Sequence, residues 1–594
     1  MSESRIWFSA NFGRGRCSVR AATILLIFVI LAASSLSAQS PTTTDVQLHK
    51  FQPTVQPGQA GSAASKAATA NQETSSNGIS ATALQQMLAL QQEKASRTAP
   101  QQKVDSNVLF TIRMMAGQPV APGVPSLYTG IDLDADNRIV VDIVANVTDA
   151  LLSQLTAVNA QVLYSNRDLR SIRASVPPEQ IEAIAASPDV IFISPKQGSL
   201  TRQQDVTGRS RSLFQHNTLP GFNQRAAQVR RQLAAGLNSA GTIQMGQGKV
   251  ETEGDSTHRA IDAREVFGVD GSPLKIGVLS DGVTSLALSQ ATGDLPPTCG
   301  TPPCLTVLSG QAGAGDEGTA MLEIVHDMAP GASLYFATAD NSITSFAQNI
   351  RNLRTAGCDI IVDDVFYFVE SPFQDGQTPA VVSTTQGGVV TQAVNDVVAS
   401  GALYFSAAGN EGNEDGSTSG TYEGDFVPVA AGAPLPTGNV HNFGSTTYDA
   451  ITSPGEQVVG LWWTDPLGGS NNDYDLYLLN STGTSILGAS TNIQNGTQDP
   501  VELIGSANVI NNNRLVVFQH TGAANRFFHL VLFRGRLSVN TAGETHGHSA
   551  ASGAFTVAAT PAATSAGAPT PNGPFPKPFT SANQIEFFSS DGLR

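Results

Sequence analysis

The chain contains 594 residues, of which 14% are charged and 40% are hydrophobic, and its formal net charge is -16 at pH 7. Its length favours several domains, and its 56 Gly and 32 Pro favour a soluble, loop-rich protein over a coiled or fibrous one. The acidic balance argues against nucleic acid as a partner, and we expect a monomer.

The first 38 residues are typical of a cleaved signal peptide. Several arginines precede a short apolar stretch at 21–33, and small residues lead from it to Ala38. That stretch is too short to cross a bilayer comfortably, so we predict secretion to the extracellular or periplasmic space, with no membrane contact after cleavage. An uncleaved anchor is the alternative, because the basic region is long.

Two polar stretches read as linkers. Residues 39–104 are rich in Ser, Thr, Ala, Gln and Pro, which predicts a disordered linker with a possible short helix at 84–93. Residues 201–262 are polar and carry several arginines, which predicts a basic exposed linker and a candidate site of proteolytic processing.

Between these linkers, residues 105–200 predict a small α+β unit. Short β-type segments alternate there with two segments of helical spacing, one of which has proline early in the helix. An ordinary ferredoxin-like module is one interpretation of this order. The expected strands are 138–143, 161–164, 171–176 and 190–193, and the expected helices are 147–158 and 178–186.

From residue 263 onward, strand and helix patterns alternate, which predicts an α/β fold with a doubly wound parallel sheet. This pattern occupies 263–425 and returns at 546–594. Residues 426–545 instead contain β-type segments separated by Gly, Asn and Ser turns. We therefore predict that an inserted antiparallel β-sandwich interrupts the parallel domain.

A group of oxygen-bearing side chains lies inside the predicted insertion. Asp473 and Asp475, next to Asn471 and Asn472, could bind calcium, which prefers oxygen ligands. A solvated turn is the alternative interpretation.

The cysteines outside the leader divide into a pair and a single residue. Cys299 and Cys304 flank a Gly-Thr-Pro-Pro turn, so we predict a small disulfide, with two free thiols as the alternative. Cys358 lies in an apolar run and is expected to be a buried structural residue.

Four sequence blocks, in this order and spacing, resemble the subtilase superfamily of serine peptidases. They are the strand 276–282 with Asp281, the helix start Glu317-Gly318-Thr319, the glycine-flanked Asn410, and the turn at 588–592. The resemblance implies a subtilisin-like fold and a secreted endopeptidase, made as a zymogen, that cleaves protein or peptide substrates and requires no cofactor. Asp281 would orient the base, Glu317 would be the base, and Asn410 would donate to the oxyanion. Residues 105–200 then resemble the propeptides that chaperone and cap such enzymes.

Glu317 departs from the family pattern, because subtilases have histidine at this position. The related sedolisins use glutamate there with an aspartate one helical turn later, where this chain has Met321, so Asp281 is the better partner. The pKa of a free glutamate is about 4.3, against about 6.5 for a free histidine. A helix N-terminus favours the carboxylate further, although a nearby Asp281 works in the opposite direction. We predict an acid-shifted pH optimum; an acid of purely structural use is the alternative.

Three other titratable residues lie near these blocks. Asp363 and Asp364 belong to a hydrophobic strand, where a buried acid pair is costly unless it is paired or functional. We therefore take Asp364 as a further candidate site residue. His326 falls on the opposite face of its helix from Glu317, because each residue turns the helix by about 100°, and we expect it to be packed or hydrogen-bonded.

A second departure concerns the nucleophile. The family's serine stands in Gly-Thr-Ser before small residues and proline, whereas Gly483-Thr484-Ser485 precedes Ile486 and reads as a turn of the insertion. The sequence ends at Arg594, before the expected position of the true serine. We therefore expect a truncated peptidase that is inactive as it stands. A noncatalytic secreted binding or adhesion protein, using the β-sandwich on a peptidase-derived scaffold, is the alternative.

Overall fold

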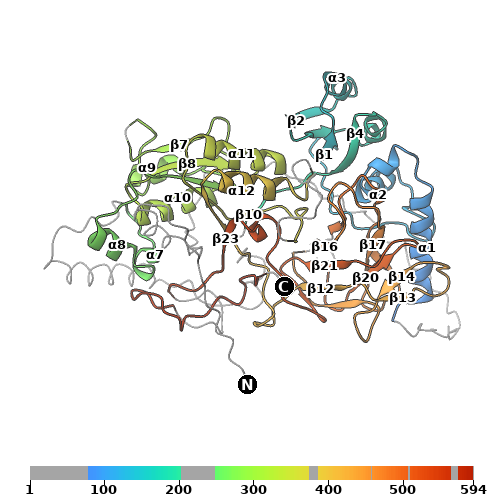
Figure 1. Cartoon of the computed structure of the whole chain (residues 1–594). Coiled ribbons are helices and arrows are strands. Elements are labelled where there is room, and N and C mark those ends of the chain that lie inside the picture. The colour runs from blue at the N-terminus through green and yellow to red at the C-terminus, as the bar shows by residue number, and fades with distance from the viewer. Residues whose placement is uncertain are drawn as a thin grey trace, which may run out of the picture.

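The computed structural model describes residues 78–201, 248–300, 302–373, 385–456, 458–505, 509–563 and 573–592. Figure 1 shows a parallel sheet with its helices on the left, a small α+β unit at the top, and an antiparallel region on the right. The predicted signal peptide at 1–38, and most of the predicted basic linker at 201–262, lie outside the described residues.

Six strands form a sheet in the order β23-β11-β9-β6-β8-β7, and all neighbouring pairs are parallel. The central strands β6 and β9 are almost entirely buried, as expected for a parallel sheet covered on both faces. The predicted α/β fold with a parallel sheet is therefore confirmed. The strands are β6 (Lys275–Ser280), β7 (Leu305–Val307), β8 (Ser333–Thr338), β9 (Ile360–Asp363), β11 (Leu403–Ala407) and β23 (Ala554–Val557).

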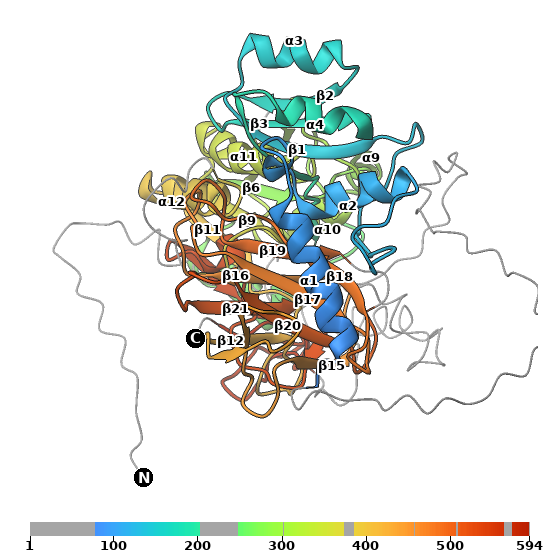
Figure 2. The same ribbon diagram turned by 90° about the vertical axis from the view of Figure 1, so that its right-hand side faces the viewer.

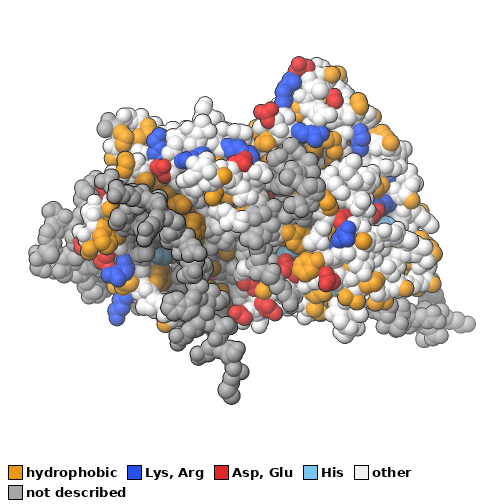
Figure 3. All heavy atoms as spheres, in the orientation of Figure 1, with side chains coloured by type: hydrophobic (Ala, Val, Ile, Leu, Met, Phe, Trp, Pro, Cys, Tyr) orange, Lys and Arg blue, Asp and Glu red, His pale blue; other side chains and the backbone are white. Residues whose placement is uncertain are grey.

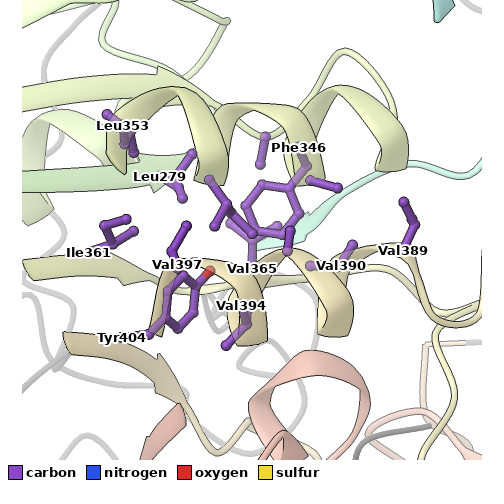
Figure 4. Close-up of a cluster of buried hydrophobic side chains, with 14 of the residues drawn as sticks. Leu279, Phe346, Leu353, Ile361, Val365, Val389, Val390, Val394, Val397 and Tyr404 are labelled. Carbon is purple, nitrogen blue, oxygen red and sulfur yellow. The ribbon is translucent and has the colours of Figure 1, made fainter. Parts of the chain in front are cut away.

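Helices cover the two faces of this sheet. Leu279 packs with Phe346 of α11 and Val394 of α12 in one cluster, which Figure 4 shows between the strands and these two helices. The adjacent residue Val278 points to the opposite face and packs with Leu322 of α10, because successive side chains of a strand alternate. The helices are α7 (Glu253–Thr257), α8 (Ala260–Phe267), α9 (Leu286–Thr292), α10 (Glu317–Met328), α11 (Ile343–Thr355), α12 (Val389–Ala399) and the 3-10 helix η5 (Gly547–Ala550).

The small α+β unit contains a four-stranded antiparallel sheet in the order β2-β3-β1-β4. Its strands and helices lie within a few residues of the predicted positions, and their apolar residues form a cluster of their own. The elements are β1 (Ile139–Ala145), α3 (Asp149–Ala157), β2 (Gln161–Asn166), β3 (Ser171–Val176), η3 (Pro178–Gln180), α4 (Ile181–Ala185) and β4 (Val190–Pro195).

The antiparallel region consists of two sheets that share one buried apolar cluster. Its first strand begins at Thr421, before the predicted boundary at 426. One sheet has the order β12-β21-β16-β19, and its strands are β12 (Thr421–Asp425), β16 (Val458–Trp463), β19 (Val501–Gly505) and β21 (Phe527–Leu532). The other contains β13 (Pro428–Ala430), β14 (Asn439–His441), β15 (Asp449–Ser453), β17 (Tyr474–Leu479), β18 (Ile486–Ser490), β20 (Arg514–Gln519) and β22 (Arg536–Leu537).

The prediction of a disordered linker is wrong for residues 78–104. This stretch forms α1 (Ala81–Ala95) and η2 (Gln101–Lys103), and it leads into α2 (Ser106–Met115). Ser80 caps α1, and Leu84, Met87 and Leu90 are buried against β17, β18 and β20; Figure 2 shows α1 lying across these strands. Alanine and glutamine are good helix formers, and tertiary packing supplies the stability that their composition alone does not reveal.

Cys299 and Cys304 form a disulfide, and Cys358 is buried as a free thiol, as predicted. On the face drawn in Figure 3, acidic and basic side chains are scattered among hydrophobic ones. Among the described residues, no helix combines the length and the apolar character needed to span a bilayer.

Candidate functional site

The carboxyl ends of three neighbouring strands bring the candidate residues to one edge of the parallel sheet. Asp281 follows β6, Asp364 follows β9, and Asn410 lies shortly after β11, and these strands are adjacent in the sheet. Functional groups of open parallel sheets lie at this edge. The sheet thus gathers residues that are far apart in the sequence.

Asp281 caps the helix that carries Glu317. Its Oδ1 accepts hydrogen bonds from the backbone N–H groups of Gly282 at 2.5 Å, Glu317 at 3.1 Å and Gly318 at 3.3 Å. Burial raises the pKa of Asp281 above its usual range, and these backbone donors oppose that effect. The first turn of α10 is therefore fixed directly against the end of β6.

Two glycines make this close approach possible. A Cβ on Gly315, where φ is +118°, would lie 2.0 Å from Asp281 Oδ2, and a Cβ on Gly318 would lie 2.4 Å from the ring of Phe336. Any larger side chain would push the helix away from the strand. Close packing against Phe336 therefore explains why the middle residue of the Glu-Gly-Thr block is glycine.

Glu317 is the first residue of α10 and its side chain is buried. Ser280, the last residue of β6, donates a hydrogen bond to its Oε1 at 3.1 Å. Burial, together with the negative charges of Asp364 and Asp281, raises the pKa of Glu317 to about 8, although hydrogen bonds from Thr201 and Ser280 act in the other direction. This direction is opposite to the acid shift expected from the sequence, because burial and Asp364 outweigh the helix N-terminus.

The two acids at the end of β9 have different surroundings. Asp364 is buried and its charge acts on Glu317, so the structure brings this predicted residue to the site. Asp363 instead accepts hydrogen bonds from Tyr404 and, at 2.8 Å, from Ser406, and it contacts His548 Nε2 at 3.2 Å. Although burial by itself raises the pKa of Asp363, His548 lowers it overall.

His548 completes a buried charged cluster behind the site. Its Nδ1 lies 2.9 Å from Glu370 Oε2, and its ring is fully buried against Phe346. Burial alone would lower its pKa, but the carboxylates of Glu370 and Asp363 raise the pKa to about 10. The imidazolium therefore serves the packing of β9, η5 and the segment after β10 (Val365–Phe366).

The segment around Asn410 is held against the C-terminal turn at 588–592. Ser590 donates to Glu411 Oε2 at 2.6 Å, and the backbone N–H of Ser590 donates to the carbonyl of Gly409 at 2.8 Å. Asn413 Nδ2 donates to the carbonyl of Ser589 at 3.0 Å. The last two blocks of the sequence motif are therefore neighbours in space.

An extended piece of the chain's own N-terminal part lies beside these carboxylates. β5 (Leu200–Thr201) pairs antiparallel with β10, with Thr201 opposite Val365 and Leu200 opposite Phe366. Thr201 is also a hydrogen-bond partner of Glu317. An extended backbone thus reaches the buried glutamate along the edge of β10.

The predicted calcium position is filled by a lysine. Lys94 Nζ lies 2.6 Å from Asp473 Oδ1 and 2.7 Å from Asp475 Oδ1, and it lies 3.2 Å from His520 Nε2. Burial alone would lower the pKa of Lys94, but Asp475 and Asp473 raise it overall. The carboxylates and His520 have the spacing of metal ligands, yet the ammonium supplies the positive charge between them.

The remaining sequence predictions concern two residues that the site does not use. His326 is half-buried on α10, and this burial lowers its pKa and favours the neutral imidazole. Ser485 lies in the turn between β17 and β18, within the antiparallel region.

Sequence reasoning missed four groups that shape this site: Ser280, Thr201, His548 and Glu370. Ser280 directly precedes Asp281, and a hydroxyl at the end of an otherwise apolar strand was the available signal. The others come from distant segments, and their partners are visible only after folding.

Comparison with family models and with curated proteins finds no match. Among solved structures, 34 chains match, and the similar structures include subtilisin-like serine proteases. Fervidolysin from Fervidobacterium pennivorans, a keratinolytic enzyme related to subtilisin, is 12% identical with a TM-score of 0.26, over 50% of this chain and 44% of its own. The CspB protease of Clostridium perfringens is 11% identical with a TM-score of 0.29, over 51% and 72% of the two chains.

The epidermin leader peptide processing protease EpiP of Staphylococcus aureus is 12% identical with a TM-score of 0.25, over 47% of this chain and 62% of its own. This chain thus spans less than half of fervidolysin in the matched region.

Proposed function

We propose that this protein is a secreted peptide hydrolase of the subtilase type. Glu317 takes the proton of the nucleophile, Asp281 holds the start of α10 and so orients Glu317, and Asn410 donates to the oxyanion. The nucleophile is a serine, the residue type that the resemblance to subtilases implies. No metal is required for this chemistry, and the substrates are proteins or peptides.

The observation that carries the proposal is the pairing of β5 with β10. It places an extended backbone on β10, the short strand that follows β9 in the chain, and directs it toward a buried glutamate. Backbone hydrogen bonds to a strand edge are a general means of binding extended peptides. A site built only to bind would gain nothing from burying Glu317 beside Asp364, which is costly.

Glu317 can act as a base only after losing its proton. Because its pKa is raised to about 8, the fraction of the competent carboxylate increases as pH rises through that value. We therefore expect hydrolysis to become faster between about pH 6 and about pH 9. A displaced β5 would expose Glu317 to water and move this profile toward lower pH.

The test measures labelling and peptide hydrolysis by the purified protein. We expect labelling by a fluorophosphonate and hydrolysis of peptides, and we expect Glu317→Gln to slow hydrolysis by about 1,000-fold or more. Glu265→Gln, at an exposed position of α8, is the matched control and should hydrolyse peptides at the wild-type rate.

Wild-type rates in Glu317→Gln would contradict the assignment of the base. Peptide binding without labelling or hydrolysis would favour the noncatalytic binding alternative.

A further inference from the structure

Leu200, the residue before Thr201 in β5, packs into an aromatic pocket. The pocket is formed by five buried residues: Phe366, Phe368, Trp462, Val531 and Phe533. The ring of Phe368 lies 5.6 Å from that of Trp462 and meets that of Phe533 edge-on at 5.5 Å, between centroids. The extended segment is thus held by a side chain as well as by its backbone.

Most of this pocket belongs to the antiparallel region. Trp462 lies on β16 and Val531 on β21, on the outer face of their sheet, whereas Trp463 and Leu530 point into the cluster between the two sheets. An outward-facing side chain of an antiparallel strand is normally polar. Here it is apolar because it covers the segment that pairs with β10.

Arg534 adds a polar contact from the same region. Its Nη2 donates to the backbone carbonyl of Thr201 at 3.3 Å, and its Nη1 forms an ion pair with Glu456 at 2.6 Å. The guanidinium also lies 4.9 Å from the ring centroid of Phe533. The ion pair with Glu456 and the contact with the Phe533 ring therefore hold the guanidinium that donates to the extended backbone.

We propose that the antiparallel region forms one wall of the peptide groove and selects extended peptides with a large apolar residue at the position of Leu200. Phe366, Trp462 and Val531 receive that side chain, and Arg534 binds the carbonyl of the next residue. The inference rests on the proposed function, because it assigns the substrate class of that site. A small or charged residue at this position leaves the aromatic pocket unfilled or desolvates a charge.

The test measures binding, so that it does not depend on catalysis. Leu200→Ala weakens the chain's own occupancy, and a fluorescent peptide with the sequence of residues 195–201 is then added in trans. We expect the peptide with leucine to bind about 10-fold more tightly than the same peptide with alanine in its place. Leu163→Ala, at an exposed position of β2, is the matched control. In this variant Leu200 should stay in its pocket, so the added peptide should not bind.

Arg534 is tested in the same Leu200→Ala background. We expect Arg534→Gln to weaken binding of the leucine peptide by about 10-fold, and Arg536→Gln, at an exposed position of β22, to leave it unchanged. Equal affinity for the leucine and alanine peptides would overturn the proposal, and this comparison requires no change in the protein beyond Leu200→Ala.

The outcomes separate the two proposals. Selective binding without hydrolysis by the complete protein would refute the peptidase and keep the groove. Hydrolysis that is indifferent to the residue at this position would refute the wall and keep the peptidase.

Discussion

Glu317 shows how one buried carboxyl couples stability to pH. Its pKa is about 8 in the folded protein, raised by burial and by Asp364 and Asp281 from an ordinary value of 4.5. Between these values the unfolded chain has released a proton that the folded chain keeps. Raising the pH therefore favours unfolding across this window, and the free energy of unfolding falls until the folded carboxyl also ionises.

Glu317→Gln removes this dependence while keeping the size of the side chain and an acceptor for Ser280. We expect the variant to gain stability relative to wild type as the pH rises from about 5 to about 9, by several degrees in Tm. Asp327, whose pKa burial also raises to about 8, and Asp449, whose pKa burial raises to about 6, contribute equally to both proteins.

Thermal unfolding of the two proteins at several pH values measures the difference. A difference that stays constant with pH would show that Glu317 is ionised throughout and that its environment is polar.

At the scale of elements, a charged cluster ties the returning chain to the parallel sheet. After the antiparallel region the chain forms η5 and then β23, which pairs with β11. His548 of η5 lies between Asp363 at the end of β9 and Glu370. Asp364 directly follows the end of β9. The ion pairs of His548 therefore hold the strand whose next residue, Asp364, lies close to Glu317.

His548→Gln leaves two buried carboxyl groups without their cation. We expect a loss of about 3–5 kcal/mol in the free energy of unfolding near neutral pH. Because the folded pKa of His548 is raised to about 10, its contribution is complete below its usual pKa and is lost as pH rises through about 10.

The difference between wild type and His548→Gln should therefore shrink toward about pH 10 in denaturant unfolding. A difference that grows with pH would mean that the imidazole is neutral in the folded protein.

At the scale of the whole molecule, the N-terminal part is fastened to the antiparallel region. The apolar side of α1 covers β17, β18 and β20, and Lys94 lies buried between Asp473 and Asp475. Arg97, two residues after the end of α1, donates a hydrogen bond to the backbone carbonyl of Thr491 at 2.7 Å. The segment that supplies β5 is therefore held at one end by α1 and at the other by β10.

Lys94→Met tests this attachment. Removing the ammonium leaves Asp473 and Asp475 buried together, and we expect amide hydrogen exchange of residues 81–95 to become at least about 10-fold faster. Lys577→Met, at an exposed position, is the control. Unchanged exchange in Lys94→Met would show that apolar packing alone holds α1.

The same variant examines the metal prediction. If calcium restored protection in Lys94→Met, the two carboxylates and His520 could hold a metal once the ammonium is gone. If calcium has no effect, the cluster is specific for the lysine.

The sequence by itself determined the parts of this protein that depend on local pattern. Strand and helix periodicity predicted the parallel sheet, because each element must bury an apolar face. The blocks around Asp281 and Glu317 each showed a local pattern, a strand followed by an acid and a helix start with a glycine, and their resemblance to subtilases indicated that they meet where β6 ends and α10 begins.

Tertiary structure alone decided what these residues experience. Lys94 meets Asp473 across 379 positions of sequence, so a stretch with a linker-like composition becomes a docked helix, and its ammonium lies between the two aspartates that were predicted as calcium ligands. Asp364 and burial set the direction of the Glu317 pKa shift. Desolvation and charge act through space, and neither the depth of a side chain nor its distant neighbours can be deduced from local sequence.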